Sequence, residues 1–172
     1  MLRLFKSLCF TMFVLTITGC SDNTKDQAAY RGTWQLETRQ TPQGETYQAP
    51  AISGLIEWFP TAPDQAHVLI TISQDADQIQ VFDGIYTISE TTFEATGNIR
   101  IGGMMGGPLE AGYDTNPEKM SGQITSEDAR VILKHQNGPT FEFIGPQLTI
   151  THANGIQDIW KRQKDQKGAL AN

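Results

Sequence analysis

Hydrophobic and polar residues alternate along most of the chain with a period of two. In residues 33–38, Trp34, Leu36 and Thr38 share one face, and the polar residues between them share the other. This is the period of a half-buried β-strand, whereas a helix would repeat its apolar positions every 3.6 residues. Similar segments are Gly54 to Phe59, His67 to Ser73, Gln78 to Phe82, Gly84 to Ser89, Thr92 to Thr96, Asn98 to Gly102, Met120 to Thr125, Ala129 to Gln136, Thr140 to Ile144, Gln147 to His152 and Ile156 to Arg162.

The spacing of these segments predicts an all-β fold. Several segments lie close enough to fuse into longer bent strands, so we expect eight to ten strands in total. Short strands separated by Gly, Pro, Asn and Asp are typical of antiparallel barrels and sandwiches. The C-terminal third predicts a four-stranded meander, because its segments are separated by Asn137-Gly138, Gly145-Pro146 and Asn154-Gly155. Asn-Gly favours the positive φ angles of a two-residue type I′ turn.

The first twenty residues differ from the rest. Arg3 and Lys6 precede an apolar stretch from Leu8 to Thr18, and Gly19 and Cys20 follow at once. The stretch is shorter than the roughly 20 residues of a membrane-spanning helix, but it fits the apolar region of a secretory signal. We therefore expect the protein to be exported.

The junction Ile17-Thr18-Gly19-Cys20 resembles the lipobox of bacterial lipoproteins. The resemblance implies a diacylglyceryl group on the sulfur of Cys20, cleavage before this residue and acylation of the new amino group. Several acyl chains would anchor the protein to a membrane firmly. Ser21, where Asp would favour retention in the inner membrane, implies an outer-membrane lipoprotein facing the periplasm. The alternative is an ordinary secretory signal with a chance cysteine.

Composition adds limits to this layout. The chain has 172 residues, of which 38% are hydrophobic and 19% charged, and it has no basic block. One modest domain without a nucleic-acid partner is therefore expected. We assign residues 1–19 to the signal, 20–30 to a lipid-anchored tether, 31–162 to the barrel and 163–172 to a flexible tail. Loss of the signal would change the net charge from −6 to −8 and would remove Cys9. With Cys20 lipidated, no free thiol would remain.

A second resemblance concerns the folded domain. The G-x-W start in residues 31–36 is similar to the first strand of lipocalins and bacterial lipocalin-like domains, and residues 44–50, 54–56 and 84–86 extend the likeness. It implies a lipocalin-like barrel in which Trp34 lies at the closed end beneath a cation from the last strand, for which Arg162 is the candidate. Such a contact contributes roughly 0.5 to 2 kcal/mol. The alternative is that Trp34 is ordinary core and Arg162 is solvated.

The META domain is a weaker resemblance. It rests on the same G-T-W start, on residues 101–105, and on the ending formed by residues 148–150 and 160–162. META domains also occur as envelope lipoproteins, so this resemblance would change the fold but not the location.

His135 and His152 are the ionisable pair with the most suggestive placement. Each lies on the apolar face of its strand, two residues before an Asn-Gly turn. They should therefore point to one end of the sheet, about 10 Å apart at the backbone. Two imidazoles so placed could share a metal or a ligand carboxylate, but no further ligand is identifiable, so structural histidines are favoured and no metal or cofactor is expected.

The Gly-rich segment 102–108 carries Met104 and Met105 on a backbone that bends freely. It could form a lid over a pocket, a docking loop for another envelope protein, or a strand bend in which a methionine fills a gap in the core.

The leading hypothesis for function is the binding of a small apolar or amphipathic ligand inside the barrel. Barrels of about eight strands can hold one such ligand. The alternative is a structural or interaction lipoprotein with a filled barrel that contacts another envelope protein. An enzyme is not expected, because no nucleophile with its base can be identified.

The lipobox predicts one labelled residue. Cells that express the protein and are fed labelled palmitate should label the wild type, whereas Cys20→Ser should carry no label and leave the membrane fraction. Label that persists in Cys20→Ser would contradict the prediction.

Overall fold

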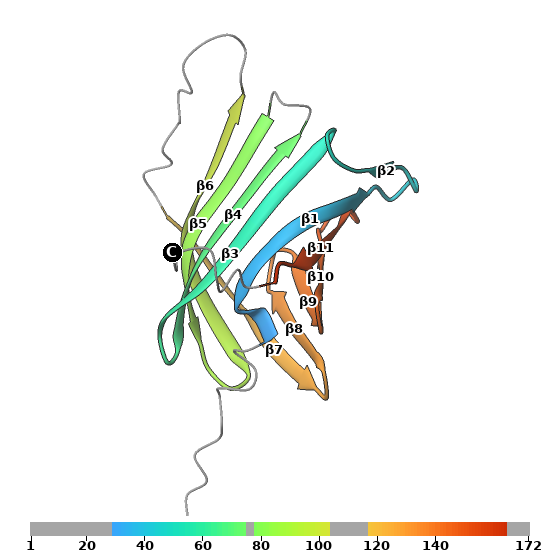
Figure 1. Ribbon diagram of the computed structural model, residues 1–172. Helices are drawn as coiled ribbons and strands as arrows, with labels where there is room; N and C mark the ends of the chain where they lie inside the picture. The colour runs from blue at the N-terminus through green and yellow to red at the C-terminus, as the bar shows by residue number, and fades with distance from the viewer. Residues whose placement is uncertain (1–28, 75–77, 104–116, 165–172) are drawn as a thin grey trace, which may run out of the picture.

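The computed structural model describes residues 29–74, 78–103 and 117–164, which form an antiparallel β-barrel (Figure 1). In this part of the chain no helix is long and apolar enough to cross a membrane. The strands are β1 (Gly32–Gln40), β2 (Thr46–Tyr47), β3 (Ile52–Ala62), β4 (Gln65–Gln74), β5 (Gln78–Ile88), β6 (Thr92–Gly103), β7 (Glu118–Glu127), β8 (Arg130–His135), β9 (Thr140–Ile144), β10 (Gln147–Thr151) and β11 (Gln157–Arg162).

Ten of these strands close a ring. From β3 to β11 each strand pairs with the next in sequence, and β1 closes the ring by pairing with both β3 and β11. The two-residue β2 pairs with the far end of β1. The predicted all-β barrel of eight to ten strands with a C-terminal meander is confirmed.

The predicted fusion of short segments is confirmed in β5 and β6. Gly84 and Gly97 stand opposite each other in these two strands, where separate segments were predicted to meet. A Cβ atom would lie 2.6 Å from the Phe82 ring at Gly84 and 2.7 Å from it at Gly97. Only glycine therefore allows the Phe82 ring to lie over both strands.

A β-bulge in β1 corrects one predicted position. Before it, Leu36 pairs with Trp160, and after it Thr38 pairs with Ile159, so Glu37 is the extra residue. Such an insertion reverses the alternation of inward and outward side chains. The prediction that Thr38 shares the inner face of Trp34 and Leu36 is wrong, because Arg39 is the next buried residue.

The prediction of two type I′ turns is also wrong. The only positive φ angle in either Asn-Gly pair is at Gly155, and both connections are longer than two residues. A two-residue turn at Asn137-Gly138 would place Leu133 opposite Glu142, whereas the observed register places it opposite Phe141. Matching of the inward apolar side chains therefore determines the loop length.

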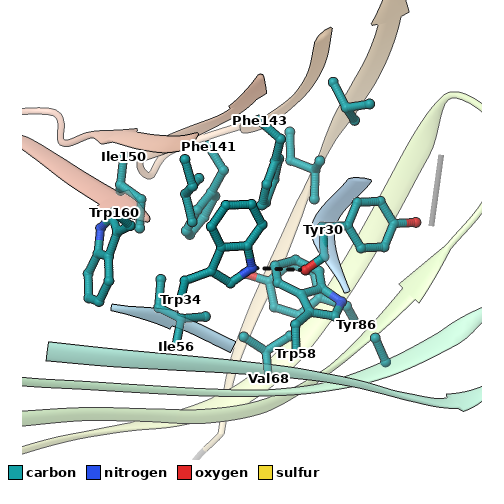
Figure 2. Packing of buried hydrophobic residues seen from close by; sticks show 14 of the residues in the cluster. Tyr30, Trp34, Ile56, Trp58, Val68, Tyr86, Phe141, Phe143, Ile150 and Trp160 are labelled. Atoms are coloured by element: carbon teal, nitrogen blue, oxygen red, sulfur yellow. Dashed lines mark hydrogen bonds between the residues drawn. The ribbon is translucent and has the colours of Figure 1, made fainter. Parts of the chain in front are cut away.

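Aromatic side chains fill one end of the barrel, which we call the closed end. Trp34 and Phe143 meet edge to face with ring centroids 5.5 Å apart, and Tyr30 lies 5.0 Å from Trp58 (Figure 2). The indole N–H of Trp34 donates to the backbone oxygen of Tyr30, at 3.2 Å. These four side chains are almost completely buried. Tyr30, assigned from sequence to the tether, thus belongs to the core.

Arg162 completes the closed end. Its guanidinium lies 4.5 Å from the centre of the Trp34 ring and donates to the backbone oxygen of Ala29. Trp34 and Arg162 are also partners in the pairing of β1 with β11. The contact that the lipocalin resemblance implied between these side chains is therefore present.

Replacement of Arg162 should destabilise the barrel. Arg162→Ala removes the contact with Trp34 and the hydrogen bond to Ala29, so we expect a loss of about 1 to 3 kcal/mol in the free energy of unfolding. This change in the free energy of unfolding can be measured by urea denaturation, with tryptophan fluorescence as the signal.

Lys161→Ala is the matched control, because this neighbouring cation is mostly exposed and lies 3.4 Å from Glu37 on the surface. It should change stability by less than about 1 kcal/mol. Equal losses in the two variants would contradict the role assigned to Arg162.

Candidate ligand-binding cavity

The other end of the barrel, which we call the open end, contains a cavity of about 240 Å³. Most of its wall comes from the parts of β4, β5, β6 and β7 near Gln74, Gln78, Gly103 and Glu118, and from residues around the turns at 136–139 and 152–156. Tyr86, near the other end of β5, also lines it. Most of the lining is apolar, and a few polar side chains from β5, β8 and β11 and the turns beside them interrupt it. The lining residues are Ile70, Ile72, Gln80, Val81, Phe82, Tyr86, Ile99, Met120, His135, Pro139, Phe141, Ile150, His152 and Asp158.

The interior therefore has two parts. In the closed end and the middle of the barrel, Trp34, Phe143 and Trp160 are fully buried and fill the space between the strands (Figure 2). Gly54 permits this filling, because a Cβ atom there would lie 2.8 Å from the ring of Trp160. The cavity of about 240 Å³ lies beyond these side chains, at the open end.

His135 is part of a buried hydrogen-bonded pair at the cavity wall. Its Nδ1 lies 2.7 Å from the backbone oxygen of Pro139, and its Nε2 lies 2.9 Å from the hydroxyl of Tyr86. A carbonyl only accepts, so Nδ1 carries the hydrogen and Nε2 accepts from Tyr86. Burial lowers the pKa of His135, although the bond to Pro139 offsets part of this effect. Burial raises the pKa of Tyr86, which keeps its proton.

A second polar cluster joins β1, β11 and the turn before β11. Asp158, which is fully buried, accepts two hydrogen bonds from Arg39, one from Nε at 2.6 Å and one from Nη2 at 2.8 Å. His152 Nε2 lies 2.8 Å from the Oδ2 atom of Asp158. Gln74 accepts from Nη1 of Arg39 at 3.3 Å. Two-point pairing of a guanidinium with a carboxylate is the strong form of such a contact.

This cluster keeps Asp158 ionised. Burial alone would raise the pKa of Asp158, but the hydrogen bonds from Arg39 and His152 and the positive charges beside it outweigh burial, so the pKa lies below its ordinary value of 3.8. The Nε2 atom of His152 must then carry the hydrogen that it shares with the carboxylate.

The structure brings together only some of the residues singled out from sequence. His135 and His152 lie at the same end of the barrel, as predicted, and both line the cavity. Trp34 and Arg162 lie at the closed end and do not line the cavity. Met104 and Met105, like Ile17, Thr18, Gly19 and Cys20, lie outside the described residues.

Arg39 and Asp158 were not singled out from sequence. Asp158 shares the alternation of Trp160, so the sequence contained a signal for an inward carboxylate that would need a cation. Arg39 had no such signal, because its inward position depends on the bulge at Glu37.

Within residues 29–74, 78–103 and 117–164, no other ligand group joins the two histidines. Among the described residues, no three His, Cys, Asp or Glu side chains are placed to hold a metal ion. Both nitrogens of His135 already have hydrogen-bonding partners.

Comparisons with known proteins give only distant likenesses. No family model matches the chain, and no curated protein matches it. The chain is similar to a redesigned β-barrel at 17% identity, covering 80% of this chain and 94% of that one, with a TM-score of 0.37. It is also similar to mFAP1, a redesigned β-barrel bound to DFHBI, at 18% identity, 80% and 97% coverage and a TM-score of 0.37. A third similar structure is a de novo designed fluorescence-activating β-barrel, at 11% identity, 79% and 95% coverage and a TM-score of 0.36.

Because Asp158 is buried and paired with Arg39, replacing its carboxylate with a neutral group should greatly reduce the stability of the protein. Asp158→Asn leaves the buried guanidinium of Arg39 without its counter-ion, so we expect a loss of about 3 to 5 kcal/mol in urea denaturation at neutral pH. Because the pKa of Asp158 is depressed in the folded state, its contribution is present above the ordinary value of 3.8 and is lost as pH falls through the folded value. The difference between wild type and variant should therefore shrink in acid.

Asp83→Asn provides the control. Asp83 pairs with His67 at 2.6 Å, but both side chains are about two-fifths exposed. Asp83→Asn should lower the free energy of unfolding by less than about 1 kcal/mol. A loss in Asp158→Asn no larger than in Asp83→Asn would overturn the role given to the cluster.

Proposed function

We propose that the protein is a lipid-anchored envelope lipoprotein of lipocalin-like type that binds a small, mostly apolar molecule in the open end of its barrel. The observation that carries the binding part is the cavity of about 240 Å³, whose wall is mostly apolar and includes a few polar groups. Sites for small molecules combine these two features.

The size of the cavity limits the ligand. An engineered apolar cavity of about 150 Å³ binds benzene, and ordinary ligand pockets begin near 300 Å³. A cavity of about 240 Å³ lies between these values. The ligand is therefore larger than one six-membered ring and smaller than most drug-sized molecules, which corresponds to about two fused rings or a short branched chain.

The proposed anchor would set the direction of the cavity. Ala29 contacts Arg162 at the closed end, so the chain that leads back to Cys20 leaves the barrel there. Nine residue steps separate Cys20 from Ala29, a span of at most about 30 Å. In the proposed arrangement the closed end faces the outer membrane, and the cavity opens toward the periplasm.

One surface feature favours the alternative of an interaction protein. On the outer face of the sheet, Phe59 and Ile85 flank His67 in neighbouring positions of β3, β5 and β4. Phe59 is 47% exposed and Ile85 39% exposed. A partner envelope protein could cover this row, although exposed apolar residues in small numbers are common on soluble proteins.

Binding of naphthalene tests the proposed function. The non-lipidated protein should bind one naphthalene, measured by calorimetry or ligand fluorescence. Ile70→Phe, which adds a ring to the cavity wall, should weaken this binding about tenfold or more because the added side chain occupies the space. Ile85→Phe makes the same change on the outer face and should leave the affinity unchanged.

Native mass spectrometry of protein purified from cells addresses the natural ligand. A co-purifying small molecule that is lost in Ile70→Phe would support the proposal. Absence of naphthalene binding, together with an empty mass and a co-purifying protein, would favour the interaction role instead.

A further inference from the structure

The two histidines at the cavity differ in what they can offer a ligand. His135 uses both ring nitrogens in bonds to Tyr86 and Pro139. His152 uses only Nε2, which donates to Asp158. Within the part of the chain that the structure describes, Nδ1 of His152 has no hydrogen-bonding partner, and its side chain, which lines the cavity, is one-third exposed.

The hydrogen bond from His152 to Asp158 determines which ring nitrogen carries the hydrogen in the neutral imidazole, and so whether Nδ1 donates or accepts. Asp158 is held by two bonds from Arg39 and accepts the Nε2 hydrogen of His152. In the neutral imidazole the other nitrogen then carries a lone pair and accepts a hydrogen bond. The carboxylate also fixes the orientation of the ring, in the way that an outer partner orients a histidine at a binding site.

We propose that the cavity binds a neutral, mostly apolar molecule with one hydroxyl group, and that this hydroxyl donates to Nδ1 of His152. This inference rests on the proposed function, because it names the class of ligand for the same cavity. The apolar wall accommodates the body of the molecule, and His152 supplies a directed acceptor at the polar side.

The charges around the cavity favour a hydroxyl over a carboxylate. Among the described residues that line the cavity there is no lysine or arginine. The charge of Arg39 is already matched by Asp158 through two hydrogen bonds. A carboxylate placed in the cavity would lose hydration without a cation of its own, which is costly in an apolar site. A neutral O–H group loses much less hydration free energy than a carboxylate, and it gains one hydrogen bond in the cavity.

The experiment compares matched probes at neutral pH. We expect the non-lipidated protein to bind 2-naphthol roughly three- to tenfold more tightly than naphthalene, which is the range that one net hydrogen bond provides. 2-Methoxynaphthalene, which has the oxygen but no donor, should bind no more tightly than naphthalene. 2-Naphthoate should bind more weakly than 2-naphthol.

Variants then locate the bond. His152→Ala and His152→Phe should abolish the preference for 2-naphthol over naphthalene. The readout is the ratio of the two affinities within each variant, because both probes experience any change that the substitution makes to the cavity wall. His152→Phe retains a ring of similar size if the alanine variant fails to fold. His67→Ala is the control, because His67 has the same pairing with an aspartate but does not line the cavity.

The outcomes separate the two proposals. The inference is overturned if the wild type binds 2-naphthol no more tightly than naphthalene. It is also overturned if both His152 variants still bind 2-naphthol more tightly than naphthalene. In either case the proposed function stands, because naphthalene binds. If 2-naphthoate binds most tightly, the ligand class is wrong. If no probe binds, the proposed function fails and the inference fails with it.

Discussion

Pairing of the first strand with the last is the constraint on which the structure depends. The contact of Trp34 with Arg162 lies at one end of this seam, and the paired charges of Arg39 and Asp158 lie at the other. These partners are more than a hundred residues apart in sequence. A single β-bulge between them lets both pairs face inward, because it shifts the alternation of β1 between the two ends. The seam thus serves both the filled core and the wall of the cavity.

Much of the fold could be predicted from the sequence, because burial of one face of a strand leaves a period of two. That period located the strands that form the ring and the C-terminal meander, and the G-x-W start correctly indicated a closed end at Trp34. It could not locate an inserted residue, so Thr38 was placed inward where Arg39 lies. Nor could local turn propensity predict the loops at residues 136–139 and 152–156, because pairing across the strands overrides it.

The candidate site was predictable only in part. Strand alternation placed His135 and His152 at one end, and both line the cavity. Their different roles depend on contacts with Tyr86, Pro139 and Asp158, which lie outside the strand of each histidine, so the pattern of a single strand does not describe these contacts. Whether a barrel is hollow depends on how large side chains from many strands fit together, as Trp160 does over Gly54. That fit is a property of the assembled ring and not of any segment.

Closure by the final strand also has a consequence for biogenesis. Until residue 162 has been synthesised, β1 and β10 each lack β11 on one side, and that edge of each strand presents unpaired backbone groups. Such edges, together with an uncovered aromatic core, are prone to pair with other chains. A ribosome-bound or truncated chain that ends before β11 is therefore expected to need a chaperone, and a stop codon that removes only the last strand would produce an aggregating product rather than a slightly shorter barrel.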